Sequence, residues 1–325
     1  MTLGIRPLTG KTLYSANGGV LGSANGAKGS PRYRANWNGN LFPPPQSGCV
    51  LYLPGHPATG TTITDFSNYF YDCTLDTAEA LTDTETDLDC SADATTIIPA
   101  GSIIQVEDEQ MRVTATGNPT ITIVRGFNGT QPVAHDTAKN IFIRTANHGT
   151  LVGATWDTLP SGVRVNSFDG VDDVITILNS ASINLIGVCT LSCWVNLRAD
   201  ENGGILDKTY TSGGYMLWIE SLAAGFKLYI SSAEQAFTGA VLLNTWYNLV
   251  GRVDGVANNL YLNGVAQTSL GLATPTGNTN NLFLGKDAGG RYPNCRASLF
   301  KAYNRALSAT EITGTYQSER HLFGV

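Results

Sequence analysis

A succession of short apolar segments, each bounded by turn residues, most constrains what this chain can fold into. Apolar side chains recur at every second position, as in Leu191, Cys193, Val195 and Leu197. Similar segments follow at residues 214–220, 225–231, 246–253 and 259–262. Asn263-Gly264 then separates two apolar runs and predicts a tight hairpin, because both turn residues need a positive φ. Short strands at a spacing of roughly 8–12 residues are typical of an all-β sandwich or barrel.

One helix is signalled near the end of the chain. Ser308 with Glu311 three residues later forms a capping-box pattern, and Leu307 before it can pack on Ile312. These signals predict a short C-terminal helix over 309–318.

Composition excludes several protein classes. Only 14% of the 325 residues are charged, and 36 are glycine, which argues against a coiled coil and a highly charged disordered chain. The longest apolar runs are strand-sized, so no membrane span is expected. The residues after Met1 lack the apolar segment of an ordinary signal peptide. We therefore expect neither a membrane partner nor secretion by that route.

Charge is divided unevenly along the chain. Residues 1–64 contain five basic and no acidic residues, which leaves 15 basic and 26 acidic residues for the remainder. No Lys or Arg occurs between Arg34 and Arg112, where twelve acidic residues fall. A positive end and a negative stretch can attract successive copies head to tail. The alternative is an ordinary basic tail beside a solvated acidic face, and the sequence leaves both open.

Residues 1–46 are predicted to form an extended arm. Glycines and Pro43-Pro44-Pro45 interrupt the segment, and no apolar period persists in it. Basic and large apolar side chains are nevertheless spread along it, which suits a segment that orders against a partner, although folding back on its own domain is the alternative. The candidate assembly residues are Arg6, Lys11, Lys28, Arg32, Tyr33, Arg34, Trp37, Leu41 and Phe42.

Five blocks in the second half of the chain resemble the laminin-G-like branch of the concanavalin-type jelly roll. They are Phe168-Asp-Gly-Val-Asp-Asp-Val174, Thr190-Leu-Ser-Cys-Trp-Val-Asn196, Trp246 to Arg252 with Tyr261-Leu-Asn-Gly264, Leu282-Phe-Leu-Gly285, and Tyr303-Asn-Arg-Ala-Leu-Ser308 with Glu311. Their order and spacing agree with the family. The resemblance implies a concanavalin-type sandwich.

The first strand of that pattern is displaced toward the N-terminus. Cys49 to Pro54 resembles it, Asp65-Phe66-Ser67-Asn68 resembles the turn that follows, and Asn147 to Leu151 resumes the pattern. The jelly roll is therefore expected over 47–75 and 145–325, with an inserted small β module over 76–144.

The insertion has its own likeness. Ile103 to Val113, Ile121 to Gly126, Asn128-Gly129-Thr130 and His135 resemble a small β module of tail, baseplate and decoration proteins of tailed bacteriophages. The pattern predicts two alternating strands joined at Gly117-Asn118-Pro119, an Arg-Gly corner and a tight Asn-Gly turn.

No catalytic constellation is evident, and we expect no enzyme. Glu107 and Glu109 would share one strand face, but two such acids more often solvate a surface than hydrolyse a glycoside. The four histidines lack metal-ligand spacing, and His135 is expected to be a hydrogen-bonding turn residue. The candidate acidic partner surface comprises Asp83, Glu85, Asp87, Asp89, Glu107 and Glu109.

Calcium is the one cofactor that the family resemblance brings into consideration. Asp65 stands where the family's turn aspartate binds the ion, but Leu299 occupies the position of the second acid. A plain turn role for Asp65 is the alternative. The six cysteines have no deducible pairing and are expected to be buried free thiols.

These patterns together predict a structural protein of an extracellular assembly, foremost a bacteriophage virion protein of the capsid decoration, tail or fibre. Its arm would dock on other copies or on virion proteins, and its jelly-roll loops would face outward and hold a glycan. The alternatives are a secreted or surface carbohydrate-binding module and a self-polymerising filament subunit. No nucleic-acid partner is expected, because the arm has a low density of basic and aromatic residues.

Overall fold

The computed structural model describes residues 12–14, 20–23, 47–54, 61–63, 65, 67, 70–127, 130–144 and 147–325. These residues are mostly β, as the alternating sequence predicts, and they include one α-helix, α1 (Ala309–Glu319). Every strand pair among the described sheets is antiparallel. Within this part of the chain no helix has the length and apolar character needed to cross a membrane.

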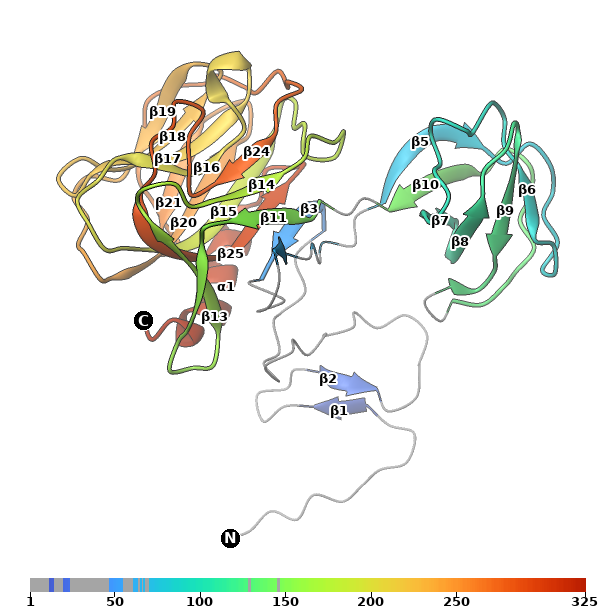
Figure 1. Cartoon of the computed structure of the whole chain (residues 1–325), viewed down its shortest axis with the longest axis horizontal. Helices are drawn as coiled ribbons and strands as arrows, with labels where there is room; N and C mark the ends of the chain where they lie inside the picture. Colours follow the sequence, from blue (N-terminus) through green and yellow to red (C-terminus); the bar gives the residue numbers. More distant parts are fainter. Residues whose placement is uncertain are drawn as a thin grey trace, which may run out of the picture.

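The first layer of the jelly roll is a nine-stranded sheet (Figure 1). Its strands in spatial order are β23 (Thr268–Ser269), β19 (Ala233–Phe237), β18 (Gly225–Ile230), β17 (Tyr215–Ser221), β16 (Gly203–Asp207), β24 (Leu282–Leu284), β14 (Val174–Ile177), β11 (Gly149–Val152) and β4 (Thr62–Ile63). Two of the strands predicted by alternation, β17 and β18, lie next to each other in this sheet.

The second layer is an eight-stranded sheet. Its path runs through β12 (Thr155–Thr158), β13 (Arg164–Asp169), β25 (Asn294–Tyr303), β15 (Cys189–Leu197), β20 (Trp246–Val253), β21 (Asn259–Leu262) and β22 (Val265–Ala266), and β3 (Cys49–Leu53) pairs with β25. The pairing of Phe300 with Leu53 places the displaced first strand in the sandwich. Leu262 pairs with Val265 across Asn263-Gly264, where both residues have positive φ, so the predicted hairpin is confirmed.

The main apolar core lies between the two sheets. Alternate residues of β15 point into it, among them Leu191, Cys193 and Val195. The opposite face of β15 is covered as well, because Trp194 belongs to a second apolar cluster with Ile312 of α1. Both faces of β15 are therefore buried, and all nine of its residues are inaccessible.

The C-terminal helix is anchored on that second face. The Trp194 ring stacks on Phe323 with centroids 4.2 Å apart, and its Nε1 donates to Glu319 Oε2 at 2.8 Å. The predicted capping box is present: Ser308 Oγ accepts from the Glu311 amide, and the Glu311 side chain accepts from the Ser308 amide. The helix ends at Glu319, one residue beyond the prediction.

A separate six-stranded sheet forms between β4 and β11 of the jelly roll. Its order is β5 (Phe70–Asp76), β10 (Asn140–Arg144), β7 (Ile103–Val106), β8 (Glu109–Ala115), β9 (Thr120–Val124) and β6 (Asp87–Asp89). It has its own apolar core, which includes Leu88, Met111 and Ile141. We call residues 70–144 the module; its sheet begins six residues earlier than the predicted insertion.

Two further differences from the sequence-based expectations concern local structure. Residues 103–113 form two strands joined at Glu107-Asp108, because Glu107 adopts a positive φ of 50° and turns the chain. Within the predicted arm, β1 (Thr12–Tyr14) pairs antiparallel with β2 (Val20–Ser23). All six cysteines are buried and free, as expected.

Candidate functional site

The outward face of the nine-stranded sheet carries an unusual set of side chains. Because successive strand residues point to opposite faces, the inward Tyr215, Leu217 and Ile219 of β17 leave Met216 and Trp218 on the other side. We call this side the outer face.

The pairing registers place one row of residues across the outer face. Met216 pairs with Tyr229 and with Asp207, and Asp207 pairs with Phe283. In spatial order from β19 to β14 the row is Glu234, Tyr229, Met216, Asp207, Phe283 and Thr176. The outer face thus carries aromatic and ionisable side chains, whereas a sheet face that packs against another layer would carry apolar ones.

A loop from Gly285 to Tyr292 passes over the next row. In that row Trp218 pairs with Lys227 on one side and Gly204 on the other. A Cβ at Gly204 would lie 2.6 Å from the carbonyl oxygen of Lys286, so only glycine lets the loop approach the sheet so closely. The loop, called the 285–292 loop below, is closed by a hydrogen bond from the Asp287 amide to the Arg291 carbonyl.

Arg291 is held in place by this loop and by the sheet beneath it. Its Nε and Nη2 donate to Asp287 Oδ2 at 2.8 and 2.6 Å, and its guanidinium lies 4.2 Å from the centroid of Trp218. The Arg291 side chain remains 49% exposed, whereas Asp287 is 2% exposed and Trp218 5%. The guanidinium therefore has a fixed orientation and an open side.

Lys286 supplies a second cation on the same loop. Its Nζ lies 5.1 Å from the ring centroid of Phe283 and 5.7 Å from that of Tyr292. No carboxylate of the described chain forms an ion pair with it. Both rings are half-buried and border the ammonium.

Asp207 anchors the loop to the sheet. Its Oδ2 accepts from the Ala288 amide at 2.7 Å and its Oδ1 from the Tyr210 amide at 3.2 Å. Burial, which outweighs these hydrogen bonds, raises the pKa of Asp207 to about 6. The Tyr210 ring lies 5.1 Å from that of Tyr229. On the far side of Trp218, Lys227 forms ion pairs with Glu220 and Glu234.

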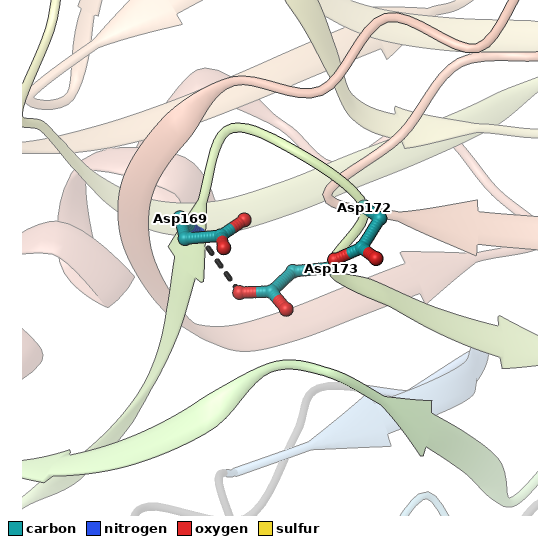
Figure 2. A group of neighbouring side chains, drawn as sticks. All are labelled: Asp169, Asp172 and Asp173. Carbon is teal, nitrogen blue, oxygen red and sulfur yellow. Dashed lines mark hydrogen bonds between the residues drawn. The ribbon is translucent and has the colours of Figure 1, made fainter.

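A group of three aspartates lies at the end of β13 (Figure 2). Carboxylate oxygens of Asp169, Asp172 and Asp173 lie within 4.8 Å of one another. The Asp169 amide donates to Asp173 Oδ2 at 2.8 Å, and the Val171 amide donates to Asp169 Oδ1 at the same distance. Burial together with the two neighbouring carboxylates raises the pKa of Asp173. Backbone amides of the turn thus donate hydrogen bonds to the carboxylates of Asp169 and Asp173.

Asp65, the predicted calcium ligand, is buried and surrounded by donors. Its Oδ1 accepts from the amides of Tyr52 and Ser67, and its Oδ2 accepts from Ser67 Oγ and the Asn147 amide, at 2.9–3.0 Å. These four hydrogen bonds use the lone pairs that a cation would need, and N–H groups do not coordinate a cation. The described neighbours of Asp65 therefore fit a turn-forming acceptor and do not fit a calcium site.

The predicted acidic partner surface is only partly a surface. Asp83, Glu85, Asp87 and Glu107 are exposed and Asp89 is half-buried. Glu109 is 1% exposed, so its assignment to this surface is wrong. The cause is that β8 begins at Glu109, whose side chain points inward to Arg125.

Glu109 is the centre of a buried polar cluster. Its carboxylate accepts two hydrogen bonds from Arg125 at 2.8 Å, two from the amides of Gly126 and Val133, and it contacts His135 Nε2 at 3.0 Å. Burial raises the pKa of Glu109, but these hydrogen bonds outweigh it and lower the pKa to about 2. His135 Nδ1 contacts Glu107 at 2.8 Å, which agrees with the predicted hydrogen-bonding role of His135.

The arm residues named from the sequence lie outside the described residues. These are Arg6, Lys11, Lys28, Arg32, Tyr33, Arg34, Trp37, Leu41 and Phe42. Sequence reasoning missed the outer-face group, because it expected the jelly-roll loops to carry any ligand. Two signals were present: Trp218 at an outward position of an alternating strand, and cations at both ends of Lys286-Asp-Ala-Gly-Gly-Arg291.

Comparison with known proteins agrees with this fold. Residues 169–313 match the family described as the concanavalin A-like lectin/glucanases superfamily. The chain therefore contains a concanavalin-like domain. No curated protein sequence matched the chain.

Parts of several solved structures are similar to parts of this chain. The binding domain of Paraclostridial Mosquitocidal Protein 1 is 15% identical with a TM-score of 0.44, over 52% of this chain and 46% of that one. Domain 4 of AbnA, a GH43 extracellular arabinanase from Geobacillus stearothermophilus in complex with arabinotriose, is 17% identical with a TM-score of 0.43, over 52% and 88%. The sialidase of Trypanosoma rangeli is 13% identical with a TM-score of 0.43, over 69% and 46%. The aligned region thus spans about half the length of the first and third of these proteins.

Proposed function

We propose that this chain is a non-enzymatic binding and display protein of an extracellular assembly, in which the outer face of the jelly roll binds a glycan. The arm of residues 1–46 docks on neighbouring subunits, and a bacteriophage virion is the setting that we favour. The resemblance of residues 103–135 to phage tail and decoration modules supports that setting.

The outer face is the observation that carries the binding proposal. Glycan sites combine aromatic rings, which pack on the C–H faces of sugars, with fixed polar groups that orient hydroxyls. Tyr229, Phe283 and Tyr292 supply partly accessible rings, and Arg291 supplies a guanidinium held in one orientation. Arg291 is itself half exposed, so part of its guanidinium stays open to a ligand while the buried Asp287 fixes its orientation.

The assembly proposal rests on the charge division of the chain. The basic segment 1–46 and the exposed acids of the module, such as Asp83, Glu85 and Asp87, have opposite signs. Attraction between them in different copies would give a self-polymerising filament, whereas docking of the arm on other virion proteins would give a decoration, tail or fibre subunit.

A glycan-binding assay tests the binding proposal. The full chain should bind members of a glycan array, and the Tyr292→Ala variant should bind them at least about tenfold more weakly, because one stacking platform is lost. Val256→Ala is the matched control, since Val256 is exposed on a different loop. Failure of the full chain to bind any glycan at high micromolar concentration would contradict the proposal.

Deletion of residues 1–46 tests the assembly proposal. The shortened protein should keep the far-ultraviolet circular dichroism of a β protein but should no longer incorporate into particles or polymerise. Normal assembly of the shortened protein would contradict docking through the arm. Assembly driven by charge should also weaken steeply with added salt, and salt-insensitive assembly would exclude the filament form of the proposal.

A further inference from the structure

We infer that the 285–292 loop and the aromatic residues beside it select an acidic sugar, one that carries a carboxylate, over neutral sugars. The inference rests on the proposed glycan-binding function and names the ligand class. Carboxylates of the sugar would pair with Arg291 and with Lys286, and a sugar ring would contact the accessible parts of Phe283 and Tyr292.

Arg291 has a fixed orientation and unused hydrogen-bond donors. Nε and Nη2 of Arg291 each donate a hydrogen bond to Asp287 Oδ2. No described residue accepts a hydrogen bond from Nη1 of Arg291. The guanidinium cannot rotate freely, because Asp287 and the ring of Trp218 hold it from two sides. A pre-oriented guanidinium matches the geometry of a carboxylate and loses little entropy on binding.

Lys286 adds a second positive charge to the loop. Its ammonium has no hydrogen-bond or ion-pair partner among the described residues and lies over two aromatic rings, so it keeps its capacity for hydrogen bonds. Lys286, Asp287 and Arg291 together give the loop residues a net charge of +1, and Asp207, which anchors the loop, is fully buried beneath it. The neighbouring group of Glu220, Lys227 and Glu234 has the opposite sign, which restricts an anion to the loop end of the outer face.

The aromatic residues beside the loop provide the surface available to the sugar ring. Trp218 is not that surface, because Arg291 covers it and it is only 5% exposed. Phe283 and Tyr292 are half-buried and flank the Lys286 ammonium. The accessible parts of these rings can therefore contact a pyranose whose carboxylate pairs with the Lys286 ammonium.

Calorimetric titration of the full chain tests the inference. The probes are oligogalacturonate, a neutral galactose oligomer of equal length, a sulfated galactose oligomer and inorganic phosphate. We expect oligogalacturonate to bind at least about tenfold more tightly than the other three probes, and its affinity to fall as salt is added.

Variants of the two cations locate the effect. Lys286→Met should weaken oligogalacturonate binding at least about tenfold, and it leaves no charge unpaired because Lys286 has no carboxylate partner among the described residues. Arg291→Gln should weaken it further, and thermal unfolding checks that the variant remains folded although Asp287 loses its partner. Arg112→Gln is the control, since Arg112 is an exposed cation of the module, and it should change affinity by less than about twofold.

The outcomes that would overturn the inference differ in what else they affect. Equal binding of the neutral oligomer, or unchanged binding by Lys286→Met, would exclude acidic-sugar selection but leave glycan binding intact. Equal binding of phosphate or of the sulfated oligomer would show a general anion site. Absence of binding by every carbohydrate, here and on the array, would remove the proposed function as well.

Discussion

The module and the outer face of the jelly roll each contain a cluster of charged residues, and the two clusters differ in how completely their hydrogen bonds are satisfied. In the module, the buried Glu109 accepts hydrogen bonds from Arg125 and two backbone amides and also contacts His135. On the outer face, Arg291 is half exposed and the Lys286 ammonium has no hydrogen-bond or ion-pair partner among the described residues.

This difference separates a structural role from a binding role. A buried cluster whose donors and acceptors are all used stabilises the local fold and offers nothing to a ligand. Oriented but incompletely used groups at an accessible position add little stability and remain free to bind.

The largest effect is expected at Glu109. Glu109→Gln leaves Arg125 buried without a counter-ion, and breaking a buried pair costs about 3–5 kcal/mol. Hydrogen exchange measured by mass spectrometry should show faster exchange in peptides of β7 to β9, with the jelly roll unchanged. Asp83→Asn is the control, because Asp83 is exposed. Unchanged exchange in the module would mean that the cluster is not structural.

Acid should destabilise the module through the same residue. The pKa of Glu109 is about 2 in the fold, below its ordinary value of 4.5. Its stabilising contribution of roughly 3 kcal/mol is therefore present above pH 4.5 and is lost as the pH falls toward 2. Hydrogen exchange of module peptides at a series of pH values, corrected for intrinsic rates, measures this loss. If acid lowers the stability of the wild-type module no more steeply than that of the Glu109→Gln variant, the prediction is wrong.

Asp207 should show the opposite dependence in the jelly roll. Burial raises its pKa from 3.8 to about 6, so the folded state favours the protonated form. The corresponding stabilisation of roughly 2–3 kcal/mol is complete below pH 3.8 and is lost as the pH rises through 6. Denaturant unfolding of wild type and Asp207→Asn should diverge over this interval, and parallel curves would contradict the assignment.

The smallest effect is expected at the helix cap. Ser308→Ala removes the hydrogen bond to the Glu311 amide and should lower stability by about 1 kcal/mol. Because α1 packs on the eight-stranded sheet, away from the outer face (Figure 1), glycan affinity should not change. A loss of affinity in this variant would show that the outer face is not an independent site.

Much of the fold was predictable because its signals are local. Alternation identified β15, β17, β18 and β20, and the capping box placed α1 within one residue. The boundary of the module was not predictable, because alternation in Phe70–Asp76 does not show which sheet the strand joins.

The candidate site was less accessible to sequence reasoning because it depends on distant contacts. Trp218 and Arg291 meet only through the strand order β17-β16-β24, which no local pattern specifies. Glu109 was misassigned for a related reason: in a run of acids, sequence alone does not distinguish the turn residue Glu107 from the first inward residue of β8.

Hydrogen–deuterium exchange of the full chain with and without oligogalacturonate tests the central claim most directly. If the outer face is the binding surface, exchange should slow in peptides covering the 285–292 loop and β24, and the module should show no change. Slower exchange confined to residues 70–144, or to peptides of the eight-stranded sheet, would contradict the claim.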